Sequence, residues 1–202
     1  MIPQRHVSPE ILMSFSAGAL SSATAAIVAA HLDWCPVCRA RLARLDILGG
    51  LMLERAPSAP VNVEAALAKW ASAGAGSGLV HHPRGSGTPL ERHLPTPLAA
   101  QTGFERASIP WRPVNDGVHL AEARLPGDGG LRFVKLDAGK TLPFGERVEA
   151  ALVLWGELAR GRETLLSGDF ADGDDLAQGG PVALAAGCTL VLSVSASPSA
   201  LG

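Results

Sequence analysis

Apolar residues recur at helical spacing through the first third of the chain. Ser8-Pro9-Glu10 supplies an N-cap, a proline at the first helical position and an early acidic residue, and an apolar pattern follows as far as Gly18. Ser21 or Ser22 can cap a second helix over 24–34. A third helix is expected from Pro36 to residue 55, and a fourth, capped by Asn62, over 62–71. Residues 1–74 are therefore predicted to form a small all-α domain.

The third predicted helix has two distinct sides. Its expected apolar side holds Leu42, Leu45, Leu48, Leu51 and Met52, and a basic strip holds Arg39, Arg41 and Arg44. Such a strip is most often a solvated helix face, although it can also meet acidic residues of a partner. Gly49-Gly50 costs roughly 1 kcal/mol per glycine against alanine. The pair is expected to mark a kink or a place where another backbone packs closely.

The pattern changes twice after residue 74. The stretch AGAGSG starts at residue 73, and a stretch rich in proline and histidine follows it without apolar periodicity. Residues 75–104 are therefore predicted to form a flexible linker. From residue 105, short apolar or alternating runs are bounded by Gly and Pro, which predicts strands. These runs cover 117–125, 131–139, 148–159, 163–170, 181–187 and 188–195. Residues 105–202 are therefore predicted to form an all-β domain, a sandwich or small barrel.

Glycine-rich turns are expected between these strands. Gly127-Asp128-Gly129-Gly130 is a strong turn signal. The pairs Gly168-Asp169 and Gly173-Asp174 are expected to mark further turns.

Composition narrows the class of protein. The chain has 202 residues, a net charge of −2 and a pI of about 6.3, so nothing in its charge favours nucleic-acid binding. Three cysteines are an odd number, which argues against a secreted disulfide framework. The N-terminus lacks the apolar core of a signal peptide, and the longest apolar runs are too short to cross a bilayer. We expect a cytoplasmic protein without a membrane segment.

The string HLDWCPVC contains the most specific chemical signal in the chain. It places His31, Cys35 and Cys38 at helical i, i+4 and i+3 spacings, so that all three face one way. His6 would have to reach them from a separate N-terminal arm. Two imidazoles and two thiolates form the closed ligand set of a structural zinc site. A redox thiol pair is the alternative, but it requires a βαβ context that is missing around this motif.

Other candidate residues have simpler interpretations. His81, His82 and His93 are expected to be solvated linker residues. Cys188 is expected to be a buried small apolar residue in a strand.

The arrangement of His6, His31, Cys35 and Cys38 on a short helical domain resembles the ChrR-type zinc-binding anti-sigma factors. The strings PFGERVEAALVLWGEL, LLSGDFADGDD and PVALAAGCTLVL resemble the cupin domain of the same group. The resemblance covers nearly the whole chain. It implies an α+β multidomain protein, with an N-terminal helical zinc domain that sequesters an extracytoplasmic-function (ECF) sigma factor. It also implies a C-terminal all-β cupin-like barrel that takes part in signal sensing.

The cupin domain departs from the family pattern at its metal site. The resemblance aligns Glu149 with the family's glutamate and places Cys188 near its cysteine, whereas Pro143, Gly145 and Gly179 fall where histidines belong. One carboxylate and one thiol do not hold zinc tightly. We therefore expect one zinc, in the N-terminal site, and an empty cupin site.

Three classes of function compete at this stage. A regulator that sequesters a sigma factor, without catalytic residues, fits the zinc motif and the resemblance. A metal-dependent cupin enzyme, an isomerase or dioxygenase, is the alternative, but without cupin histidines a facial triad cannot be assembled. A zinc-dependent adaptor or DNA-binding domain would require a basic recognition helix, and direct nucleic-acid contact is not expected.

Overall fold

The computed structural model describes residues 3–58, 60, 62–72, 93–126, 129–143, 148–177 and 180–195. Five helices come first: α1 (Pro9–Ser16), α2 (Ser22–Trp34), α3 (Pro36–Arg55), α4 (Val63–Ser72) and α5 (Thr96–Thr102). A short 3-10 helix, η1 (Arg106–Ser108), leads into the β domain. Its strands are β1 (Arg112–Asn115), β2 (Val118–Arg124), β3 (Gly129–Leu136), β4 (Val148–Arg160), β5 (Glu163–Leu166), β6 (Phe170–Asp172) and β7 (Val182–Ser195), with helix α6 (Gly173–Ala177) before β7.

The first four helices form where the sequence predicts them, because their caps are local. The Ser8 hydroxyl accepts the Ile11 N–H, and the Ser21 hydroxyl accepts the Thr24 N–H. The Asn62 side chain accepts the Ala65 N–H at 2.9 Å. Helix α3 runs unbroken through Gly49 and Gly50, and a Cβ at either position would have nothing within 4 Å. The expectation of a kink or of close backbone packing at these glycines is therefore wrong.

The end of the predicted linker is structured. Helix α5 lies within residues 75–104 and packs on α2, with Leu94 and Leu98 buried. The Thr96 N–H donates to the Asp33 side chain at 3.1 Å. A helix of seven residues is too short to show periodicity, so only its contacts with α2 reveal it. The first part of the predicted linker, with His81 and His82, lies outside the described residues.

The strands form one antiparallel sheet in the order β1-β2-β3-β7-β4-β5, and β6 pairs with β4. The two runs predicted over 181–187 and 188–195 form a single strand, β7. Strand β1 was not predicted, and the turn expected at Gly173-Asp174 begins helix α6 instead. Gly127 and Asp128 lie outside the described residues. The expected order of fold classes, a helical N-terminal part followed by an all-β domain, is confirmed.

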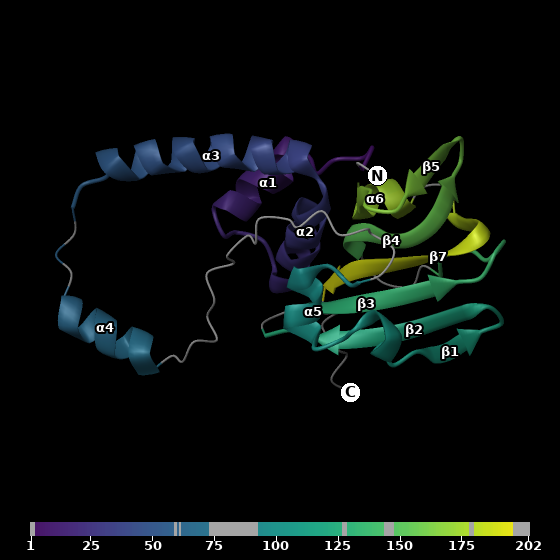
Figure 1. Cartoon of the computed structure of the whole chain (residues 1–202). Coiled ribbons are helices and arrows are strands. Elements are labelled where there is room, and N and C mark those ends of the chain that lie inside the picture. Colours follow the sequence, from purple (N-terminus) through teal and green to yellow (C-terminus); the bar gives the residue numbers. More distant parts are fainter. Residues whose placement is uncertain are drawn as a thin grey trace, which may run out of the picture.

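Two hydrophobic cores lie on the two faces of the sheet. The inner core contains residues from β2, such as Val118, and from β5, such as Leu165, so the sheet curls around it. The outer core joins the helices to the sheet, and Ile27 of α2 and Phe133 of β3 both lie in it. Nine of the thirteen α2 residues are buried, and α2 lies against β3, β4 and β7 (Figure 1). The helical region and the β domain therefore share one core. Among the described residues, no helix is both long and apolar enough to cross a membrane.

Candidate metal centre

His6, His31, Cys35 and Cys38 meet at the junction of α2 and α3. Each offers one ligand atom, and the four atoms lie within 4.8 Å of one another. His6 is far from the other three residues in sequence, but the N-terminal arm (residues 3–8) runs back to this junction and brings it close to them. This is a group that can hold a metal ion, made of the four residues that the sequence pattern selects.

The local backbone explains how the two thiols come together. Helix α2 ends at Cys35, which is both the C-cap of α2 and the N-cap of α3, and its sulfur accepts the Cys38 N–H at 3.4 Å. Pro36 occupies the first position of α3, where its missing N–H costs nothing. Cys38 then lies in the first turn of α3. The helix junction therefore points both sulfurs towards one place.

The imidazoles complete the set from two directions. His31 is fully buried on α2, with Nε2 3.3 Å from the Cys38 sulfur. Nδ1 of His6 lies 3.2 Å from the Cys35 sulfur. Nδ1 of His31 lies 2.8 Å from the carbonyl oxygen of Gly168. Because a carbonyl only accepts, Nδ1 of His31 carries the proton, and the lone pair of Nε2 faces the thiols.

The two thiols differ in how readily they lose a proton. The pKa of Cys35 is lowered to about 3, because Cys38 hydrogen-bonds its sulfur and His31 lies beside it, against the opposing effect of burial. The pKa of Cys38 is raised, because the same hydrogen bond keeps the proton on Cys38 and burial disfavours a second thiolate. Two sulfurs that share one proton in this way suit a cation, which replaces that proton and stabilises both thiolates.

The spacing of the ligand atoms matches a tetrahedral zinc. Ligand atoms about 2.0–2.3 Å from a tetrahedral ion lie about 3.5 Å from one another. The nitrogen-to-sulfur distances of 3.2 and 3.3 Å are close to that value. Zn²⁺ prefers this donor set of two nitrogens and two sulfurs in closed, four-coordinate sites. The residues present therefore fit zinc, and no position is left open for a substrate.

Glu149 and Cys188, the two residues that the resemblance aligns with cupin metal ligands, lie apart in the structure. The carboxylate of Glu149 accepts hydrogen bonds from the hydroxyls of Ser21, at 3.1 Å, and Thr24, at 2.7 Å. Cys188 pairs with Gly156, seven residues along β4 from Glu149, which places the two roughly 20 Å apart. Burial raises the pKa of Cys188 to about 12, so its thiol stays protonated. Pro143 offers no side-chain donor, and Gly145 and Gly179 lie outside the described residues.

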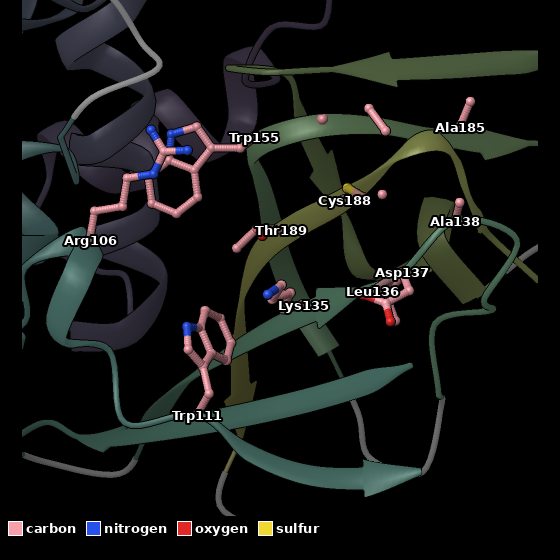
Figure 2. Close-up of a pocket in the computed structure, with 13 residues that line it drawn as sticks. Arg106, Trp111, Lys135, Leu136, Asp137, Ala138, Trp155, Ala185, Cys188 and Thr189 are labelled. Carbon is pink, nitrogen blue, oxygen red and sulfur yellow. The ribbon is translucent and has the colours of Figure 1, made fainter. Parts of the chain in front are cut away.

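A separate groove of about 490 Å³ lies on the β domain, beside η1. Figure 2 shows Trp111 and Trp155 among the residues that line it, together with Thr189 and Lys135. The Arg106 guanidinium lies 4.4 Å from the centre of the Trp155 ring. Arg106 therefore makes a cation–π contact with Trp155 at the edge of the groove. Among the described residues, no cluster of metal ligands lies in this groove, and sequence patterns did not single it out.

Two residues near the metal centre make structural contacts that the sequence did not indicate. Arg39, assigned to a solvated strip, donates to the carbonyl oxygens of Leu32 and Asp33 and so caps the C-terminal end of α2. Asp169, assigned to a turn, is fully buried beside the arm that carries His6. His93 is exposed and lies outside the cluster, as expected. No short motif could have linked Asp169 to the arm, because its partners there, Gln4 and Arg5, lie more than 160 residues away.

Comparison with known proteins shows which proteins this chain resembles. No family model matches the chain. The anti-sigma-E factor ChrR of Cereibacter sphaeroides is 32% identical over 191 residues, which cover 91% of this chain and 85% of that protein. The crystal structure of Rhodobacter sphaeroides SigE in complex with the anti-sigma ChrR matches with a TM-score of 0.74 and 26% identity, over 96% of this chain and 100% of the matched chain. An RmlC-like cupin from Shewanella frigidimarina matches with a TM-score of 0.35 and 14% identity, over 46% of this chain and 89% of the matched chain.

Proposed function

Because this chain belongs to the ChrR family of anti-sigma factors, we propose that it binds an ECF sigma factor and withholds it from RNA polymerase. The observation that carries the proposal is an apolar stripe on α3. Ile47, Leu48, Leu51 and Met52 are between 49% and 68% exposed and lie at helical spacing along one side. Helix α4 adds Val63 and Leu67, which are also exposed. Large apolar side chains gathered in this way mark a surface for a protein partner.

The metal centre gives this surface its geometry. Zinc on His6, His31, Cys35 and Cys38 would tie the arm, α2 and the start of α3 together. Helix α2 is anchored in the outer core, so the angle at Cys35 sets the direction in which α3 presents its stripe. The role of zinc here is structural: it supplies folding free energy that a small helical region with little core lacks.

The donor set of two imidazole nitrogens and two thiolate sulfurs favours zinc over other metals. The same closed donor set leads us to propose that the site is not catalytic. A closed site has no position for a reacting molecule. A cupin enzyme, the alternative function, would need a second metal held by Glu149 and Cys188, which the strand register keeps apart. The cytoplasm is the compartment in which the chain would meet a sigma factor and keep its thiols reduced.

Reconstitution tests the proposed function directly. The chain would be co-expressed with each ECF sigma factor of its own genome, and the complexes would be purified and assayed in transcription with core RNA polymerase. We expect one sigma factor to form a stable complex and to lose promoter-specific transcription. Failure of every sigma factor to bind a folded, metal-loaded chain would contradict the proposal.

Metal analysis gives a second prediction. The purified chain should hold one tightly bound zinc, because the described residues bring one complete ligand set together. Substituting Glu149→Gln should leave the zinc content at one per chain, whereas Cys38→Ser should abolish it. Mass spectrometry of the native protein and elemental analysis measure both. Two tightly held ions per chain would show that the cupin domain has a metal site after all.

A further inference from the structure

The outer shell of the metal centre comes from the β domain. The short turn between β5 and β6, residues 167–169, lies against the arm and against α2. Gly168 and Asp169 of this turn each contact the segment that carries one imidazole ligand. The two thiols, in contrast, are oriented locally by the helix junction.

Gly168 orients His31. Its carbonyl oxygen accepts the Nδ1–H of His31 at 2.8 Å, which fixes the tautomer that leaves Nε2 facing the thiols. Only glycine fits here: its φ is +92°, and a Cβ would lie 2.9 Å from the Pro3 side chain and 3.6 Å from the Trp34 ring. The Phe170 ring packs edge-on against the His31 imidazole, with centroids 6.1 Å apart.

Asp169 holds the arm that brings His6. Its carboxylate is fully buried, and Oδ1 accepts the backbone N–H groups of Gln4, at 2.6 Å, and Arg5, at 2.9 Å. Oδ2 accepts the Leu166 N–H at 2.9 Å. Hydrogen bonds to a buried carboxylate are strong and are costly to leave unmade. An ion pair between Arg5 and Glu163 adds a further tie between the arm and β5.

The turn is itself fixed to the middle of the sheet. The Gly168 N–H donates to the Val153 carbonyl at 2.7 Å, and the Val153 N–H donates to the Asp169 carbonyl at 3.1 Å. Val153 lies on β4, two residues before Trp155 of the groove. A shift of β4 would therefore move the groups that orient both imidazoles.

We propose that Gly168 and Asp169 are positioning residues of the zinc centre, through which the β domain sets how tightly the N-terminal zinc is held. This rests on the zinc assignment in the proposed function. Outer-shell partners of metal ligands change metal affinity by about 10- to 100-fold when they are removed. Loss of the Asp169 hydrogen bonds should act on His6, whose arm they hold, and a displaced Gly168 carbonyl should act on His31, whose tautomer it fixes.

The test compares two aspartates of the same region in the full chain. Asp169→Asn keeps the size of the side chain but removes its charge and one of its acceptor oxygens. Asp172→Asn makes the same change three residues away, at the end of β6, where the carboxylate accepts the Asp175 N–H and does not touch the arm. Zinc affinity is measured by competition with a chromogenic chelator, and zinc release is timed after an excess of chelator is added.

We expect Asp169→Asn to weaken zinc binding at least 10-fold and to speed its release, while Asp172→Asn stays within twofold of the unaltered chain. Circular dichroism of the zinc-loaded variants checks that the sheet is intact. Cobalt substitution reads the ligand geometry independently, since the visible absorption of tetrahedral cobalt should weaken in Asp169→Asn. A folded Asp169→Asn chain with unaltered zinc affinity would overturn the inference. An unaltered chain that binds no zinc would instead overturn the zinc assignment.

Discussion

Replacing Cys35 by serine is expected to remove the zinc and, with it, the binding of the sigma factor. Cys35 lies at the junction of the two helices, where it ends α2, begins α3 and contributes a sulfur to the ligand set. A serine hydroxyl can still cap α3, but it is a poor zinc ligand at neutral pH. Zinc in sites of this type contributes on the order of 10 kcal/mol, which is comparable to the whole stability of a domain.

The loss should be selective for the helical region. Leu42 and the first turns of α3 depend on the junction at Cys35, whereas the inner core of the sheet contains no residue from the helices before β1. Circular dichroism should therefore show a loss of helix with the β signal retained, and sigma affinity should fall by more than 100-fold. Cys188→Ala is the matched control, since Cys188 is a buried thiol outside the site. Normal helix content and sigma binding in a zinc-free Cys35→Ser chain would show that the metal has no structural role.

The sequence was sufficient for features that depend on neighbours along the chain. The caps at Ser8, Ser21 and Asn62 act within three residues, so the helix starts could be read directly. The spacing of His31, Cys35 and Cys38 is also local, and it indicated a metal site before any contact was known. His6 completed the ligand set by residue type and was supported by the family resemblance, and the arm does bring it to the cluster.

Contacts between distant segments could not be predicted in the same way. The hydrogen bonds from Asp169 to the arm span more than 160 residues, and those from Glu149 to α2 span more than 120. Helix α5 is held by α2 rather than by a pattern of its own. These contacts join the helical region to the sheet. The outer core is shared between the predicted helical region and the predicted β domain. The domain boundaries at 1–74, 75–104 and 105–202 stay a prediction from the sequence.

The apolar stripe on α3 gives the sharpest test of how the sigma factor is bound. Leu48 is 55% exposed and Met52 is 68% exposed, one helical turn apart. Replacing both with glutamate should weaken sigma binding by at least 100-fold, since central apolar contacts of an interface each contribute about 2 kcal/mol or more, and 1.4 kcal/mol is a factor of ten. Exposed positions change stability by only about 0.5 kcal/mol, so melting temperature and zinc content should stay the same.

The control for this variant is Val114→Glu on β1, an apolar residue that is 47% exposed but lies on the β domain. Titration calorimetry of each zinc-loaded chain with its sigma factor, together with a promoter reporter in cells, separates the two surfaces. Loss of binding in Leu48→Glu/Met52→Glu alone would place the sigma factor on α3. Loss in Val114→Glu alone would place it on the sheet and contradict the stripe. The comparison distinguishes a specific docking surface from a general effect of added negative charge, because both variants introduce glutamate at exposed apolar positions.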